Sequence, residues 1–201
     1  MIELKNVSIK YIKDFFTIYN LNCKIEGNTI FLGDEFLGSV SLMRLLSKID
    51  KPTAGNIYID GKNLWEIKDK DLSISYIPKE PYLLNKSIEK NLMFPLKIRK
   101  VNKVEAKNRV DSLISAYNLS NFPKKIKEMS FSEKKIICLV RTLARAPKYV
   151  LLEHFFENLD QQYLPLATKI LHELEKSSTI IACEKTLTKP FETYTQIELK
   201  N

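Results

Sequence analysis

Apolar and polar residues alternate along the first part of the chain in the way that is typical of half-buried strands. This period-two pattern predicts strands at residues 2–9 and 21–25. Residues 28–32 form a short apolar run that ends at Gly33, which predicts a third strand. After Gly38 the period changes, because the leucines that follow it fall on one helical face. The pattern therefore predicts three strands and then a helix.

A hairpin and a further strand are predicted next. Residues 57–59 alternate and run into Asp60-Gly61, a dipeptide that favours a tight two-residue turn because both positions tolerate positive φ. Residues 73–77 form another strand candidate that stops at a proline.

The middle of the chain changes character. Residues 86–128 carry no strand signal, and apolar residues recur at helical spacing across 103–118, so this segment predicts an all-helical insert. Helix and strand patterns then alternate again, at 136–144, 149–152, 164–174, 179–183 and 196–199. Alternation of this kind predicts an α/β fold with a mainly parallel sheet and helices on both faces.

Composition is consistent with one globular domain. With 201 residues, 44% apolar and 28% charged, the chain can bury a core. Its apolar runs are far shorter than the roughly 20 residues that span a bilayer, and the N-terminus lacks a signal-peptide core, so we expect a cytoplasmic protein. Cys23, Cys138 and Cys183 lie in separate apolar runs, which predicts buried, reduced thiols. His154 and His172 belong to no metal-ligand pattern.

The net charge of +8 would suit an anionic partner such as nucleic acid. The lysines, however, are spread along the chain. The densest run, at residues 124–127, is short and lacks interleaved aromatic residues. We therefore favour a solvated basic surface over a nucleic-acid interface.

Four segments carry a more specific signal. They are VSIKY at 7–11, KPTAGNIYIDG at 51–61, SYIPKEP at 75–81, and RTLARAPK at 141–148, which is followed by Asn158-Leu159-Asp160. In this order they resemble the nucleotide-binding domain of ABC transporters, over essentially the whole chain. The resemblance implies a P-loop NTPase-type fold in one domain, residues 1–201. It also implies an N-terminal antiparallel β portion and a helical subdomain inserted at about 86–128.

The phosphate loop of that family corresponds to residues 33–41, GDEFLGSVS. Such a loop needs glycines whose N–H groups surround the phosphates, a lysine that reaches them and a hydroxyl for magnesium. The outer glycines, Gly33 and Gly38, remain. The other ATP-site positions are held by Phe36 (a glycine in the family), Ser39 (the lysine), Val40 (the hydroxyl) and Ser41.

Asp34 and Glu35 add negative charge where a triphosphate would bind, so we expect ATP and magnesium binding to be weakened. Some anion affinity could survive where Gly38 and Ser39 begin a helix. The favoured alternative is that the segment simply connects a strand to a helix.

The remaining catalytic positions are also altered. By resemblance, Glu153 and His154 stand where the family has the magnesium-binding aspartate and the catalytic glutamate. Glu153 could hold a metal through water and His154 could act as a base, but with the lysine absent we expect no catalysis. Lys79 replaces the glutamine that senses the γ-phosphate, where it would repel magnesium yet could meet a phosphate. Glu184 replaces the switch histidine and would repel the γ-phosphate.

The signature loop corresponds to residues 129–133, MSFSE, where Ser130 remains and both glycines are absent. The S-x-x-E form also matches a capping box in which Ser130 and Glu133 open the next helix. Asp160 either keeps the family's dimer contact or caps the helix after it.

Two further sites are implied by the resemblance. Tyr11 is the candidate for stacking on adenine, or it is a packing residue at a strand end. Residues 81–99 would form the groove that docks a permease's coupling helix, and four apolar residues there would either line it or belong to the local core: Tyr82, Leu83, Leu84 and Phe94.

These observations lead to one hypothesis and two alternatives. The hypothesis is a non-hydrolysing ABC subunit, peripheral to the membrane, that docks beneath a permease or pairs with a copy of itself or an active ATPase domain. In the family's head-to-tail dimer each ATP lies between one subunit's phosphate loop and the other's signature. Because both elements are altered, even a heterodimer would contain no complete standard site. The alternatives are an active ATPase with unusual catalytic residues, and a soluble nucleic-acid-binding module.

Overall fold

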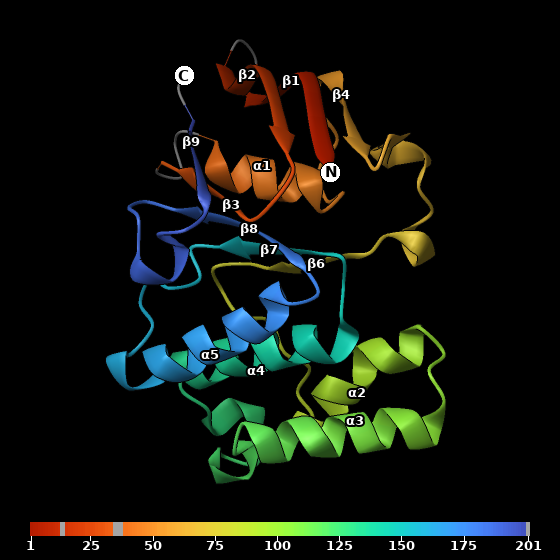
Figure 1. Cartoon of the computed structure of the whole chain (residues 1–201), viewed down its shortest axis with the longest axis vertical. Helices are drawn as coiled ribbons and strands as arrows, with labels where there is room; N and C mark the ends of the chain where they lie inside the picture. The colour runs from red at the N-terminus through yellow and green to blue at the C-terminus, as the bar shows by residue number, and fades with distance from the viewer. Residues whose placement is uncertain (13–14, 34–37, 200–201) are drawn as a thin grey trace. The chain divides into compact units, whose positions relative to one another are not determined.

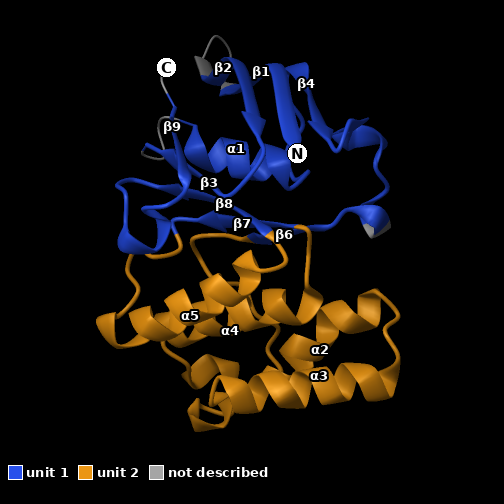
Figure 2. Ribbon diagram, in the orientation of Figure 1, with its two compact units in different colours: residues 1–76, 149–154, 179–201 blue, residues 77–148, 155–178 orange. Residues whose placement is uncertain are grey.

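The computed structural model describes residues 1–12, 15–33 and 38–199, which form two compact units (Figures 1 and 2). Unit 1 consists of residues 1–76, 149–154 and 179–201. Unit 2 consists of residues 77–148 and 155–178. In the described part of the chain, no helix is both long enough and apolar enough to cross a membrane.

The first sheet of unit 1 has four strands in the order β2-β1-β4-β5. The strands are β1 (Ile2–Ile12), β2 (Phe15–Ile25), β4 (Ala54–Ile59) and β5 (Lys62–Asn63), and the β1–β2, β1–β4 and β4–β5 pairs are antiparallel. Asp60 and Gly61 connect β4 to β5 with φ values of 51° and 79°, as a two-residue turn with positive φ requires. The hairpin prediction is confirmed.

The second sheet of unit 1 has five strands in the order β6-β7-β8-β3-β9. They are β3 (Thr29–Leu32), β6 (Ile74–Ile77), β7 (Tyr149–Glu153), β8 (Thr179–Glu184) and β9 (Thr195–Glu198). The β3–β8, β3–β9 and β7–β8 pairs are parallel. Helix α1 (Ser39–Leu46) packs against β7 and β8, and its apolar face joins one core with side chains from both sheets.

Unit 2 is helical. It contains α2 (Ile88–Ile98), α3 (Lys103–Ala116), α4 (Phe131–Arg145) and α5 (Leu164–Glu175), with α4 packed against the other three. Ser87, Asn102 and Ser130 cap the N-termini of α2, α3 and α4 by accepting backbone N–H bonds. Single 3₁₀ turns occur in both units. Those of unit 2 lie at Leu119–Asn121, Ile126–Glu128 and Gln161–Tyr163, and those of unit 1 at Leu64–Glu66, Asp69–Asp71 and Lys189–Phe191.

The predicted fold class is confirmed, since the structure contains a parallel sheet, helices and an antiparallel N-terminal sheet. The second strand is longer than expected, because β2 begins at Phe15 rather than near residue 21. Residues 86–128 contain helices α2 and α3 and two 3₁₀ turns, with no strand. Unit 2 also includes α4 and α5, and a single domain over 1–201 with an insert at 86–128 stays a prediction.

Candidate nucleotide site and signature region

The carboxyl ends of β3, β7 and β8 meet at one edge of the parallel sheet, the edge where open α/β sheets bind ligands. Leu32 is in register with Glu184, and Glu153 with Cys183, so both glutamates lie at this edge. The N–H of Gly33 donates to the carbonyl of Glu184 at 3.1 Å. The predictions for Asp34, Glu35 and Phe36 fall outside the described residues.

Two buried carboxylates dominate this edge. Glu153 is 7% exposed and Glu184 is 3% exposed, and the hydroxyl of Tyr76 donates to the Glu153 carboxylate. Burial raises the pKa of the Cys183 thiol well above its ordinary value, and the charges of Glu153 and Glu184 raise it further. Both buried side chains at this edge are acidic, and a polyphosphate is bound by cations and N–H groups rather than by carboxyl groups.

Gly38 has a structural reason to be glycine. It precedes α1 with φ of 87°, and an added Cβ would lie 2.8 Å from Ile18 Cγ1 and closer still to the carbonyl oxygen of Thr17. A larger residue would therefore be strained and would collide with β2. The close approach of β2 accounts for this glycine without a bound phosphate, which agrees with the alternative of a strand-to-helix connection.

The first residues of α1 are turned inward. Ser39, at the family's lysine position, is 0% exposed, and its side chain hydrogen-bonds to the Cys183 thiol. Ser41 is also buried, and Val40 is half-buried. Neither Ser39 nor Val40 offers a cation or an exposed hydroxyl to a nucleotide.

His154 follows β7 in a left-handed conformation with φ of 43° and is 0% exposed. Its N–H donates to the carbonyl of Cys183 at 2.8 Å, which ties it to the end of β8. A general base must reach the water or hydroxyl that it deprotonates. The buried position of His154 in this structure does not favour that role.

Tyr11 keeps an exposed ring. The side chain is 55% exposed, and its hydroxyl donates to Asp50 Oδ2 at 2.5 Å. Arg44 holds the same carboxylate through two hydrogen bonds, at 2.7 and 2.9 Å, and keeps the pKa of Asp50 below its ordinary value. The pKa of Tyr11 is raised, mainly by partial burial and next by the hydrogen bond to Asp50. The ring is thus fixed at the end of β1 with a face open for stacking.

The described residues of this edge do not fit the phosphates of ATP. The two glutamates there are buried, the lysine position holds a buried serine, and the glycine before α1 is in contact with β2. No cluster of three or more histidine, cysteine or acidic side chains suited to a metal was found among residues 1–12, 15–33 and 38–199.

Lys79 belongs to unit 2. Its Nζ lies 3.4 Å from Glu157 Oε2, and both side chains are 27% exposed. The positive charge at the γ-phosphate sensor position is therefore opposed by a carboxylate of the same unit.

The signature residues Ser130 and Glu133 form a capping box. The N–H of Ser130 donates to Glu133 Oε2 at 2.7 Å, and the N–H of Glu133 donates to Ser130 Oγ at 3.2 Å. The capping alternative is confirmed, because both side chains satisfy the first turn of α4.

The same helix turn also holds the segment that contains Asp160. The N–H of Asp160 donates to Ser132 Oγ at 2.9 Å, and the Tyr163 hydroxyl donates to Glu133 Oε1 at 3.1 Å. Asp160 precedes the 3₁₀ turn Gln161–Tyr163, yet its side chain makes no capping bond. The prediction that its carboxylate caps the next helix is wrong, since that side chain is exposed and the backbone makes the contact.

Lys135 was not anticipated from the sequence. It is 0% exposed, and its Nζ donates to the carbonyls of Phe155 and Glu157 at 2.6 and 2.7 Å. The ammonium also lies over the rings of Phe131 and Phe155, at 4.9 and 5.3 Å from their centroids. The available signal was its position between apolar residues of a helix that is otherwise buried on that face.

The predicted docking segment is partly exposed. Tyr82 is 72% exposed and Phe94 is 45% exposed, whereas Leu83 and Leu84 are half-buried. Tyr82 and Phe94 are therefore not core residues, contrary to the second interpretation of this segment.

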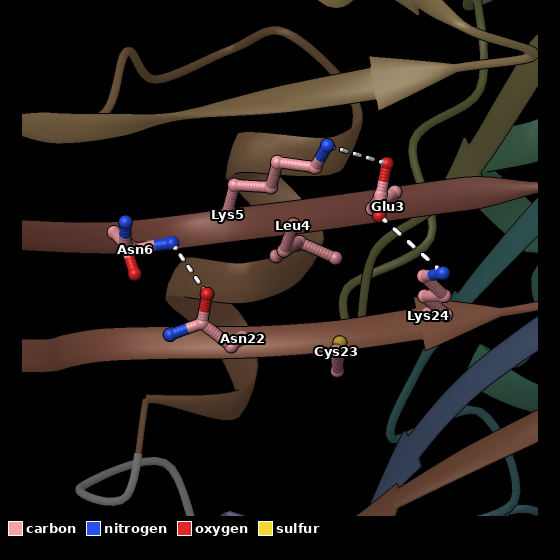
Figure 3. A pocket seen from close by; sticks show the side chains of 7 residues that line it. All are labelled: Glu3, Leu4, Lys5, Asn6, Asn22, Cys23 and Lys24. Atoms are coloured by element: carbon pink, nitrogen blue, oxygen red, sulfur yellow. Dashed lines mark hydrogen bonds and ion pairs between the residues drawn. The ribbon is translucent and has the colours of Figure 1, made fainter.

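A separate pocket lies on the antiparallel sheet between β1 and β2 (Figure 3). Glu3 there pairs with both Lys5 and Lys24, at 3.2 and 3.6 Å, so its negative charge is shared by two lysines. Cys23 in its wall is half-buried rather than buried as expected, and partial burial raises its pKa to about 11. None of these residues belongs to the sheet edge described above.

The order of strands in the two sheets, the edge at the ends of β3, β7 and β8, and the helical unit define the class of an ATP-binding cassette. The chain belongs to the ABC transporter family, whose model matches residues 17–154.

Similar proteins are named as import ATP-binding proteins. Methionine import ATP-binding protein MetN 1 of Staphylococcus epidermidis is 33% identical over 80% of this chain and 50% of its own length. MetN of Helicobacter hepaticus is 27% identical over 88% of this chain and 53% of its own. The chain therefore spans about half the length of these relatives.

Solved structures agree on the fold. A dimeric ATP-binding cassette in a post-hydrolysis state, bound to ADP and phosphate, has a TM-score of 0.83 at 19% identity, covering 100% of this chain and 94% of its own. CbiO1 of Clostridium perfringens, described as part of an ABC transporter complex, has a TM-score of 0.76 at 23% identity, covering 91% of this chain and 78% of its own.

Proposed function

We propose that this chain is a non-hydrolysing ATP-binding-cassette subunit, a pseudo-ATPase that contributes assembly or regulation to an ABC transporter. The observation that carries the proposal is the sheet edge, where Glu153 and Glu184 are buried beside a buried Ser39. A nucleoside triphosphate needs cations and accessible backbone N–H groups at that position, and the described residues supply carboxyl groups instead.

The partners are a permease subunit at the inner face of the membrane and a second cassette domain, either a copy or a different chain. The exposed Tyr82 and Phe94 supply apolar contact area for the permease. The signature side chains Ser130 and Glu133 are engaged within α4 itself. A cassette partner would therefore gain neither a working phosphate loop nor a free signature from this chain.

Titration with fluorescent ATP and magnesium, together with a phosphate-release assay, tests the proposal. We expect no saturable binding at micromolar ATP and no turnover above a buffer blank. The control is an ABC cassette of similar size with a complete phosphate loop, measured in the same buffer. Micromolar affinity with turnover that Glu153→Gln removes would overturn the proposal in favour of an ATPase with unusual catalytic residues.

A pull-down from membranes tests the partner. We expect a permease subunit to co-purify, and the Tyr82→Ser/Phe94→Ser variant to lose it while still eluting as a folded protein. Co-purification with nucleic acid alone, in a salt-dependent manner, would support the basic-module alternative instead.

A further inference from the structure

The connection between α2 and α3 combines positive charge with exposed aliphatic side chains. Residues 97–104, KIRKVNKV, contain four cations and no acid. We call this segment the basic corner. It lies at the periphery of the helical unit, where α2 ends and α3 begins (Figures 1 and 2).

The backbone of the basic corner is fixed by hydrogen bonds. The N–H of Lys100 donates to the carbonyl of Lys97, and the N–H of Val101 donates to the carbonyl of Leu96, both at 3.0 Å. This is the Schellman pattern of a helix end, and Lys100 takes its left-handed position with φ of 56°. Glycine is common there because it adopts that conformation at little cost. The chain instead presents a cation at the tip.

The start of α3 completes the corner. Asn102 caps the helix, and its Oδ1 accepts the N–H groups of Val104 and Glu105 at 2.9 and 3.4 Å. Both sides of the connection are therefore anchored, so the corner is a defined surface rather than a loose loop.

The apolar side chains of the corner face solvent. Ile98 is 65% exposed and Val104 is 68% exposed. Exposed aliphatic residues are ordinary when they are single. Here they are two, on the same connection. Ile98 lies between the exposed cations Lys97 and Arg99, and Val104 lies between the exposed Lys103 and Glu105.

The corner carries more positive than negative charge. In the described part of the chain Lys97, Lys100 and Lys103 form no ion pair. Of the nearby carboxylates, Glu89 and Asp111 are engaged by Lys107, at 3.2 and 2.7 Å, and the exposed Glu105 follows the corner directly.

The field of the corner reaches α4. Burial and the charge of Arg99 lower the pKa of Arg145 to about 10. A surface with this sign of charge selects an anionic partner.

We propose that the basic corner contacts the headgroup region of an anionic lipid bilayer. Aliphatic tips among lysine and arginine side chains suit a planar interface, because the apolar groups enter the acyl boundary while the long stems keep the charges at the headgroups. This assignment is independent of whether the chain hydrolyses ATP.

Flotation with phosphatidylcholine vesicles, with and without phosphatidylglycerol, tests this contact using the whole chain. We expect binding to the anionic vesicles alone, and weaker binding as salt is raised. Arg99→Gln/Lys100→Asn/Lys103→Gln should weaken partitioning about 100-fold, since each cation near the surface contributes about fivefold. Ile98→Ser/Val104→Ser should weaken it about tenfold without any change of charge.

The chain offers a matched control in the run Lys124, Lys125 and Lys127. Replacing all three by glutamine removes the same charge, but the isoleucine of that run, Ile126, is only 6% exposed. We expect this variant to bind vesicles within about twofold of the unchanged protein. Thermal unfolding followed by circular dichroism shows that each variant is folded.

Three results would overturn the contact. The first is an unchanged protein that ignores anionic vesicles. The second is equal loss of binding in the corner and control variants, which would mean that net charge alone attracts the protein. The third is loss of affinity for polyglutamate, but not for vesicles, in the corner variants, which would assign the surface to an acidic protein.

Discussion

The sheet edge of unit 1 and the start of α4 in unit 2 both occupy positions that the resemblance assigns to nucleotide, and they treat polar groups differently. At the sheet edge, Glu153 and Glu184 are buried beside one another's strands. At the start of α4, Ser130, Glu133 and Lys135 each complete a hydrogen bond within the chain. Burying carboxyl groups costs desolvation free energy, whereas the hydrogen bonds at a helix end and to a buried ammonium offset that cost. The two regions show that residues which no longer suit a nucleotide can either destabilise the fold, as at the sheet edge, or stabilise it, as at the start of α4.

The largest expected effect concerns Gly38. Gly38→Ala should lower the free energy of unfolding by about 4 kcal/mol, because the left-handed backbone and the clash with β2 add. Chemical denaturation followed by circular dichroism measures it. Gly61→Ala is the matched control, with φ of 79° and no atom within 4 Å of the added Cβ, and should cost about 1 kcal/mol. Equal effects would mean that contact with β2 does not explain Gly38.

Replacing Lys135 tests the other side of the comparison. Lys135→Met should lower the free energy of unfolding by about 3 kcal/mol, because the buried carbonyls of Phe155 and Glu157 lose their donor. The neighbouring Lys134→Met, which changes the same charge at a half-buried position, should stay within about 0.5 kcal/mol. If Lys135→Met left the free energy of unfolding unchanged, the contacts of Lys135 would not stabilise α4.

The pKa values of the two buried thiols, Cys138 and Cys183, show whether the charges near each thiol are mainly positive or mainly negative. Burial raises the pKa of Cys138 in α4 to about 11, with Arg141 and Lys135 opposing the rise. The pKa of Cys183 is raised more, first by burial and then by the neighbouring carboxylates Glu153 and Glu184. A raised folded pKa adds stability that is present below the unfolded value near 9 and is lost as pH increases through the folded pKa.

Unfolding free energies measured across this alkaline range should therefore fall by about 1.4 kcal/mol per pH unit for each thiol. In Cys138→Ala and Cys183→Ala the fall should be shallower. The Cys138 contribution should level off near pH 11 and that of Cys183 should continue beyond it. If both level off at one pH, the two regions do not differ in the sign of their local field.

The smallest effect concerns the capping box. Ser130→Ala should cost about 1 kcal/mol, and Ser130→Asp should restore most of it, because a carboxylate also accepts the N–H bonds of the first turn. Asn102→Ala, at the cap of α3, serves as the reference and should cost a similar amount. A much larger loss in Ser130→Ala, not restored by aspartate, would assign Ser130 a role beyond capping.

The sequence predicted the strands and helices where periodicity and turn chemistry agree. The Asp60-Gly61 turn and the capping box at Ser130 are local signals, since the residues that form them are adjacent or three apart. Residues 15–20 of β2 were missed, because their pairing with β1 is broken by irregularities and their alternation is weak. Local patterns fail where the pairing of two strands is irregular.

The site shows the same limit. The altered identities of Ser39, Val40, Glu153 and Glu184 are readable from the sequence, but their burial is not. The reason for Gly38 lies in Thr17 and Ile18, some twenty residues earlier. Lys135 finds its acceptors twenty residues later, in carbonyl groups that any residue would provide. A pattern of side chains therefore cannot predict which carbonyl groups Lys135 contacts.

The position of β3 has a consequence for synthesis on the ribosome. β3 ends at Leu32, yet both of its neighbours, β8 and β9, lie beyond Thr179. At about 5–20 residues per second, roughly 10–30 s pass between the emergence of β3 and that of its last partner. During that interval an apolar strand has both edges open. Nascent chains of this protein are therefore expected to engage chaperones early and to release them only after β8 and β9 have been made.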